Sequence, residues 1–322
     1  METGQAGTGQ PGYLQEEPSG PGPTGAGPVR GLAAVVVVLL VTALATVAVH
    51  KPDHGGARLG VGRPAPIALA SAAAALRVHT VRLHMSVSVA ITNQGRATSV
   101  DLAGDGVVDY ASRTTQMNMA FSMAGAGPQI HATEELRVLG GYVYLRFPDG
   151  FPGIRLPAGK LWLRQPAPSP FVNAGPNDPS QAIDQLRSVA RDLSVIATET
   201  VNGVQATHYS ANVRLADTPA WAALQTHNSA LANNPFVQAL ARQPFRMDAW
   251  IDAEGRLRRL AETIHFQFAG LVPNAGPGDA DDTHITIDFL DYGAPVAVQP
   301  PPAGQVADQP IPGLAGNPVP TR

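Results

Sequence analysis

The sequence predicts an α+β protein: a half-open antiparallel β-barrel of about ten strands with a helical lid, preceded by one N-terminal transmembrane helix. Three observations predict this fold class. Apolar and polar residues alternate with a period of two through most of residues 81–289. A stretch with helical periodicity, residues 178–193, interrupts the alternation. An uncharged apolar run, residues 31–49, precedes the whole pattern.

Changes in composition divide the chain. Gly (33) and Pro (30) are more frequent than in ordinary globular proteins, which favours tails and linkers outside one folded domain. We expect a disordered Gly/Pro-rich tail over 1–30, a transmembrane helix over 31–50, a linker over 51–70, one folded domain over 71–300 and a disordered Pro-rich tail over 301–322.

The run at 31–49 has the length of a membrane span. As a helix it would extend about 28 Å, close to the thickness of a bilayer's hydrocarbon core. A cleaved secretory signal is the alternative. Arg30 precedes the run, whereas Lys51, Arg58 and Arg63 follow it, so the positive-inside tendency alone favours a cytoplasmic domain. Long domains translocate despite local charge, and we expect a single-pass cell-membrane protein with its large C-terminal domain extracytoplasmic, on the resemblance given below.

The strands begin with the alternation Val81, Leu83, Met85 and onward, which predicts one buried face. A turn at 93–95 leads to a strand at 100–110, in which two glycines suggest a bulge or bend. Further strands are expected at 117–123, 130–138, 142–147 and 161–163.

Helices are expected in the middle of the chain. Asp178 and Pro179 form a good helix start, and an apolar stripe follows to residue 193. A second helical stretch is expected over 219–231, with another turn or two at 235–242.

Strands then return. Asn202-Gly203 is a strong hairpin signal joining strands at 194–201 and 204–215, and further strands are expected at 245–251, 257–268 and 285–289. Consecutive hairpins form an antiparallel meander, and a sheet of about ten strands tends to curl. The helices would cover its apolar concave side. Such a fold either packs solid or encloses an apolar cavity, and the periodicity leaves both open.

Methionines lie on the apolar parity of the predicted strands, three of them in one strand with Phe121. Met adapts to varied apolar ligands, but it also fills ordinary cores, and both readings stay open. The predicted lining of the cavity is Met85, Val87, Met117, Met119, Phe121, Met123, Leu136, Val138, Met247, Ile264, Phe266, Ile285, Ile287 and Phe289.

Catalytic motifs are not found: there is no GxSxG elbow, P-loop or HExxH. Cysteine is absent, and the nine His form no close pair at metal-ligand spacing. We therefore expect no enzymatic activity, no metal site and no cofactor. The net charge of -3 argues against a nucleic-acid binder. Arg256, Arg258 and Arg259 form a basic cluster that is either a solvated strand or a contact for an anionic head group.

Five short sequence segments, taken in their order along the chain, are more specific than the alternation of apolar and polar residues. They are Gly140-Gly141-Tyr142-Val143-Tyr144, Gly159-Lys160-Leu161-Trp162, Val201-Asn202-Gly203-Val204, Trp250-Ile251-Asp252-Ala253-Glu254-Gly255 and Asp288-Phe289-Leu290-Asp291-Tyr292-Gly293. Together, over roughly residues 75–308, they resemble the actinobacterial LppX/LprG-type lipoproteins, relatives of the LolA/LolB lipoprotein carriers. The resemblance implies an envelope protein whose half-open barrel and helical lid enclose an apolar cavity, and a lipid or lipoglycan ligand.

One departure from that family concerns the anchor. The family carries a lipobox cysteine, which this chain lacks, so the span at 31–49 would replace the lipid anchor. The expected function is a membrane-anchored, extracytoplasmic lipid-binding or lipid-transfer protein. Two alternatives remain: an envelope sensor or scaffold that binds a protein partner, and a structural envelope protein with a filled core.

Overall fold

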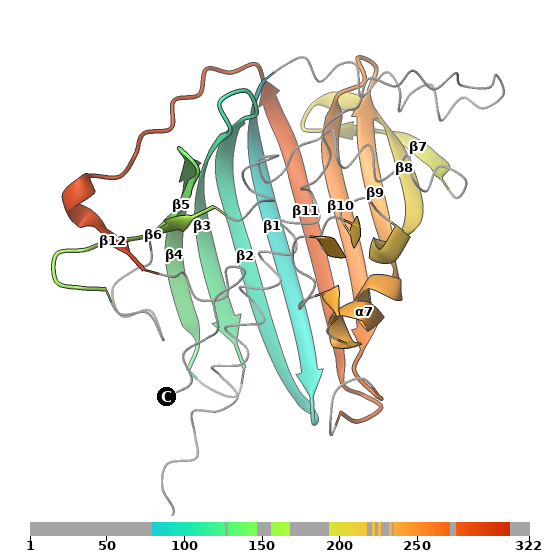
Figure 1. Ribbon diagram of the computed structural model, residues 1–322. Coiled ribbons are helices and arrows are strands. Elements are labelled where there is room, and N and C mark those ends of the chain that lie inside the picture. Colours follow the sequence, from blue (N-terminus) through green and yellow to red (C-terminus); the bar gives the residue numbers. More distant parts are fainter. Residues whose placement is uncertain are drawn as a thin grey trace, which may run out of the picture.

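The computed structural model describes residues 79–125, 128–146, 156–167, 193–217, 221–222, 225–226, 232–233, 235–270 and 275–309. Within them the chain forms one 12-stranded sheet, shown face-on in Figure 1. The strands are β1 (Thr80–Asn93), β2 (Arg96–Asp109), β3 (Thr114–Ala124), β4 (Ile130–Leu139), β5 (Tyr142–Arg146), β6 (Trp162–Pro166), β7 (Ser194–Val201), β8 (Val204–Arg214), β9 (Pro244–Asp252), β10 (Leu257–Gln267), β11 (Ala280–Tyr292) and β12 (Val306–Asp308).

Strand order in the sheet is β12-β6-β5-β4-β3-β2-β1-β11-β10-β9-β8-β7. Neighbours are antiparallel throughout, except that β12 runs parallel to β6. Sequential hairpins account for most of this order, as the turn signals predict. β1 and β11 pair in the middle of the sheet, with Met85 opposite Ile287, which joins the two ends of the meander.

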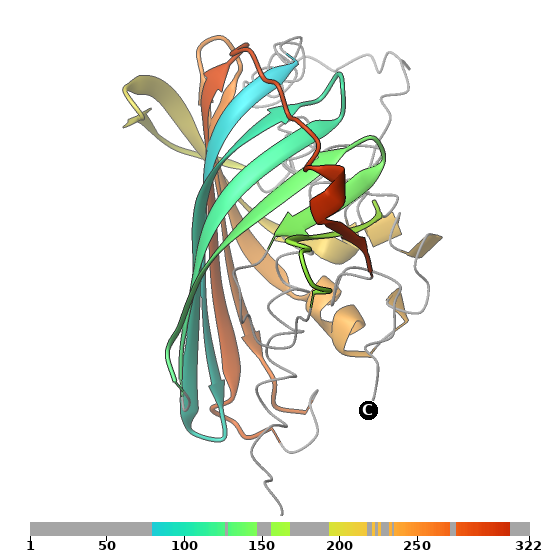
Figure 2. The same ribbon diagram turned by 90° about the vertical axis from the view of Figure 1, so that its left-hand side faces the viewer.

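The sheet is twisted and curved, and α7 (Pro235–Arg242) lies on its concave side (Figure 2). No described element lies over the convex side in that view. Side chains alternate between burial and exposure along β1, as a strand with one covered face requires. The buried apolar side chains therefore belong to the concave face.

Helix is scarce in the described residues. Besides α7 there are two short 3₁₀ turns, η1 (Leu215–Asp217) and η2 (Ala303–Gln305), and a few helical residues at 221–222, 225–226 and 232. α7 packs beside η1, in a small separate cluster around Trp221 and Ala241, and not in the main core. The helical prediction is confirmed at 235–242; the helix predicted at 178–193 lies outside the described residues except for Leu193, which is not helical.

These findings correct the predicted fold class. The described part of the chain is one open sheet, since its terminal strands β12 and β7 pair with only one neighbour each, and it has almost no helix. The expectation of an α+β half-barrel with a helical lid was therefore wrong. The prediction assigned the helical stretches at 178–193 and 219–242 to cover the sheet, whereas the described helix α7 packs in a small separate cluster and not in the main core.

The predicted transmembrane helix at 31–50 lies outside the described residues. No helix within the described ranges has the length and apolar composition needed to cross a bilayer. β12 was not expected: it lies in the segment assigned to the Pro-rich tail.

Candidate ligand-binding face

The fourteen residues predicted to line a cavity share one face of the sheet. The pairing register places them there: Phe121 is opposite Leu102, Val87 is opposite Ile285, and each belongs to the buried parity of its strand. Eleven are buried: Met85, Val87, Met117, Met119, Leu136, Val138, Met247, Phe266, Ile285, Ile287 and Phe289. The remaining three, Phe121, Met123 and Ile264, are partly exposed. We call this surface the concave face.

Two neighbouring rows of side chains cross the concave face from β4 to β9. One row consists of Glu134, Met119, Gly104, Met85, Ile287, Leu260 and Ala249. The next consists of Ala132, Phe121, Leu102, Val87, Ile285, Glu262 and Met247. Apolar side chains thus continue from strand to strand, with a carboxyl group in each row.

Two methionines occupy room that glycines leave. A Cβ atom added at Gly104 would lie 2.9 Å from Cγ of Met119, and one at Gly106 would lie 2.7 Å from Cγ of Met117. Both distances are far below van der Waals contact. The two glycines therefore let β3 side chains lie close over β2, and Met117 and Met119 contribute to packing whether or not a ligand is bound.

Glu262 is the most deeply buried carboxyl of this face, with 5% of its surface exposed. Its strand neighbours Leu260 and Phe266 share its parity and are buried with it. Burial raises the pKa of Glu262 to about 7. Burial likewise raises the pKa of Glu134, on β4, to about 7.

Polar groups continue from Glu262 onto β11. Thr283 is 3% exposed and its hydroxyl donates to Oδ1 of Asp281 at 2.6 Å. Burial raises the pKa of Asp281, and the hydrogen bond from Thr283 opposes that shift. We call Glu262, Asp281 and Thr283 the polar island. The polar island was not predicted from the sequence, although its three residues are polar at positions where the strand alternation expects apolar side chains.

The convex face carries a separate polar network. His208 lies between two carboxylates, with Nδ1 3.0 Å from Oε1 of Glu199 and Nε2 2.8 Å from Oδ1 of Asp248. Its ring stacks on Trp250 at 4.1 Å, and the Trp250 indole donates to Oε2 of Glu199 at 2.8 Å. Arg246 completes the network by donating to both oxygens of Asp248. The hydrogen-bonding groups of this network are paired with one another, and these contacts connect β7, β8 and β9.

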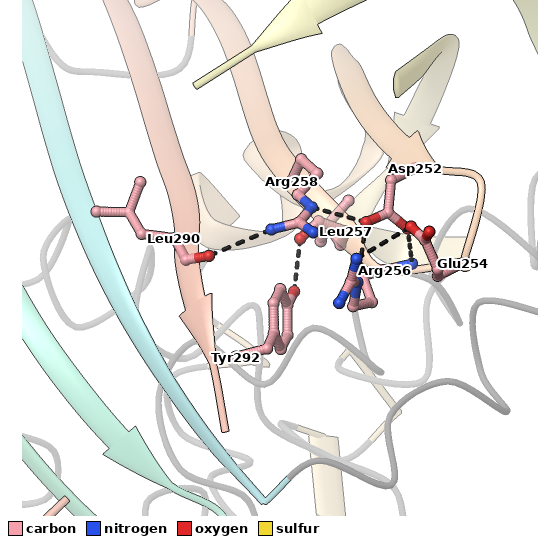
Figure 3. A network of polar contacts seen from close by, with 7 residues as sticks. All are labelled: Asp252, Glu254, Arg256, Leu257, Arg258, Leu290 and Tyr292. Carbon is pink, nitrogen blue, oxygen red and sulfur yellow. Dashed lines mark hydrogen bonds and ion pairs between the residues drawn. The ribbon is translucent and has the colours of Figure 1, made fainter. Parts of the chain in front are cut away.

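The basic cluster singled out in the sequence is engaged in ion pairs, as Figure 3 shows for two of its members. Arg256 and Arg258 donate to Oδ2 of Asp252 at 2.9 and 2.7 Å. Burial raises the pKa of Asp252, but the hydrogen bonds from both arginines outweigh that effect and hold the pKa below its usual value. Arg259 pairs with Asp288. These contacts favour a structural role over a contact with an anionic head group.

A polar groove of about 290 Å³ lies beside the edge strand β7, lined by Ser194, Ile196, Ser210, Ala211, Asn212 and Arg246. Val195 and Ile196 of this strand are exposed by 57% and 52%. No group of three or more His, Asp or Glu side chains in the described ranges is arranged to hold a metal ion.

Comparisons with known proteins give no assignment by sequence, since the chain matches no protein-family profile and no curated protein. Solved structures give weak similarities. LppX, a lipoprotein of Mycobacterium tuberculosis, is 14% identical with a TM-score of 0.33, covering 73% of this chain and 99% of its own. LprF of Mycobacterium bovis is 14% identical with a TM-score of 0.36, covering 74% and 99%.

A LolA-superfamily protein of Nitrosomonas europaea is 8% identical with a TM-score of 0.23, covering 73% of this chain and 96% of its own. At TM-scores this low, the similarity does not assign this chain to a family.

Proposed function

We propose that this protein binds lipid, with the acyl chains lying on the concave face of its sheet, and that its role is binding or transfer without catalysis. The observation that carries the proposal is the breadth of that face. Buried apolar side chains run across β3, β2, β1, β11, β10 and β9, and they include the adaptable Met85 and Met247.

The energetics suit such a face. Each methylene exposed to water costs about 0.8 kcal/mol, so a chain of about 16 carbons costs on the order of 12 kcal/mol. An apolar surface removes that cost without directional chemistry. The ordered strings at 140–144 and 250–255 support the same function, because the family they resemble carries lipids.

Membrane anchoring is the second part of the proposal. The uncharged run at 31–49 is long enough to hold the protein in the cell membrane, with the sheet on the extracytoplasmic side. A linker of about 20 residues would let the domain reach only a few tens of ångströms, which favours local transfer of a lipid or lipoglycan over free shuttling.

Lipid binding is tested on the full chain by native mass spectrometry and by organic extraction of the purified protein. Phe121→Asp places a charge on the concave face and is expected to abolish the lipid signal. Ala120→Asp is the matched control, because Ala120 is exposed on the opposite face of the same strand. Loss of lipid in the first variant alone supports the proposal. A wild-type protein that carries no lipid and binds no lipid probe contradicts it.

A second candidate function, docking of an envelope protein partner, is favoured by the edge strand β7. It pairs on one side only and exposes Val195 and Ile196. An exposed apolar edge is a template for an added strand. A photo-crosslinking residue at position 196 is expected to capture a specific partner that the same residue at position 120 does not; equal labelling at both positions argues against docking.

A further inference from the structure

Glu262, on the concave face, differs in its surroundings from the paired carboxyls of the convex face. Its cross-strand partners are Met247 on β9 and Ile285 on β11, and residues 260 and 264 flank it along β10. Directly opposed residues in a sheet have Cβ atoms about 5 Å apart, so these apolar groups form its first neighbours. Its side chain is directed to the concave face, because residues 263 and 265 of its strand are exposed on the other.

No described residue gives Glu262 a partner. Burial alone accounts for its raised pKa, with no hydrogen bond and no neighbouring charge contributing. Asp252, buried to a similar degree, is paired with two arginines instead. Buried carboxyls in proteins are normally paired or hydrogen-bonded, because an unpartnered one loses the solvation that water supplied. A carboxyl in this state is suited to a partner that the described residues do not provide, such as a ligand.

The polar groups nearest to Glu262 also accept hydrogen bonds more readily than they donate them. Thr283 lies diagonally across from it on β11, within the range of about 7–8 Å expected for such neighbours, and its hydroxyl proton is given to Asp281. The polar island therefore presents oxygen acceptors within an apolar surface. Such a site favours ligand groups that donate hydrogen bonds and disfavours phosphate and other anions.

We infer that Glu262 receives a hydrogen-bond donor of the bound lipid, an ammonium or a hydroxyl group, while the acyl chain lies across the neighbouring apolar rows of the concave face. This inference rests on the proposed lipid-binding function. It names the class of ligand: a lipid with an amine or a hydroxyl close to its chain, and not an anionic lipid without such a donor.

The test uses three probes with the same chain: dodecylamine, 1-dodecanol and dodecyl methyl ether. Binding to the full chain is measured at about pH 8 by displacement of a fluorescent apolar probe; the carboxyl, with its pKa of about 7, is mostly ionised there. The wild-type protein is expected to bind the amine, the alcohol or both about tenfold more tightly than the ether, as a charge-assisted hydrogen bond predicts.

Two glutamate-to-methionine substitutions then test which carboxyl accepts the hydrogen bond of the ligand. Glu262→Met removes it and keeps an apolar side chain of similar length, so the donor preference is expected to disappear while ether binding remains. Glu134→Met is the matched control: Glu134 is on the same face but five strands away in the sheet, so its replacement is expected to leave the preference unchanged. Glu262→Gln keeps an acceptor oxygen without charge, and distinguishes a hydroxyl donor, whose preference survives, from an ammonium donor, whose preference is lost.

Equal affinity of the wild-type protein for all three probes overturns the inference and leaves lipid binding intact. A donor preference that survives Glu262→Met, or that is lost in Glu134→Met alone, also overturns it. Failure of all three probes to bind contradicts the proposed function itself.

Discussion

Replacing Glu262 by glutamine is expected to stabilise the protein at about pH 8 and to leave its stability near pH 4 almost unchanged. Burial raises the pKa of the Glu262 carboxyl from 4.5 to about 7. A difference of that size corresponds to about 3 kcal/mol between the protonated and ionised forms. Because the folded-state pKa lies above the unfolded one, this stability is fully present below about pH 4.5 and is lost as the pH rises through about 7. Glutamine does not titrate, so the variant keeps this stability as the pH rises.

The assay is chemical denaturation of both proteins at several pH values between about 4 and 8, with the free energy of unfolding compared at each pH. The advantage of the variant is expected to grow with pH, from near zero to about 3 kcal/mol. Contributions from Glu134 and Asp281 are common to both proteins and cancel. Asp101→Asn, on an exposed position of β2, is the control and should run parallel to the wild type. A parallel curve for Glu262→Gln would refute the reasoning.

Three further predictions concern packing and pairing. Gly104→Ala places a Cβ atom 2.2 Å from a carbonyl oxygen of β3 and should cost about 1–3 kcal/mol, whereas Gly278→Ala, which meets nothing within 4 Å, should not; equal denaturation midpoints would contradict this. Thr115→Val removes a buried hydroxyl that has no partner among the described residues, and should raise the unfolding free energy by about 1 kcal/mol; a lower melting temperature would show that the hydroxyl is satisfied. Asp252→Asn breaks the buried pair with Arg258 and should cost about 3 kcal/mol at neutral pH. Because the pKa of Asp252 is lowered, the difference from wild type should begin to shrink as the pH falls below about 4 and disappear only below the lowered pKa; a constant difference would contradict the pairing.

Loss of function and gain of stability are expected together at Glu262. A buried group kept for a ligand is a cost to the empty protein, so its removal stabilises the fold while it abolishes recognition. The same pattern would distinguish Glu262 from Asp252, where replacement destabilises the protein because two arginines depend on the carboxylate.

Local sequence predicted the strands well because their signal is local. The alternation around Leu83 and Met85 fixes which side chains are buried, and the Asn202-Gly203 turn fixes the hairpin of β7 and β8. β12 escaped prediction because its three residues lie between prolines and are held in place by pairing with β6. The fold class failed for a related reason. Helical periodicity shows that a helix has an apolar stripe, but not which surface the stripe covers.

The candidate face was predicted in part. The alternation along each strand predicts which side of the sheet a residue faces, so the position of the apolar residues on one face was expected. Glu262 and Glu134 occupy the same alternating positions and were overlooked. The network around His208 was not predictable, since Glu199 and Asp248 reach it only through the registers of two different strand pairs. Such contacts depend on how strands align, which single-strand patterns do not specify.

The most direct test of the central claim is to locate the acyl chain on the protein. A fatty acid with a photoreactive diazirine near the end of its chain is bound to the full-length protein and activated by light, and the labelled residues are mapped by peptide mass spectrometry. Labels on concave-face side chains of β1, β2, β3 and β11, such as Val87 and Phe121, are the predicted result. Labels confined to the convex face or to the β7 edge would contradict the account.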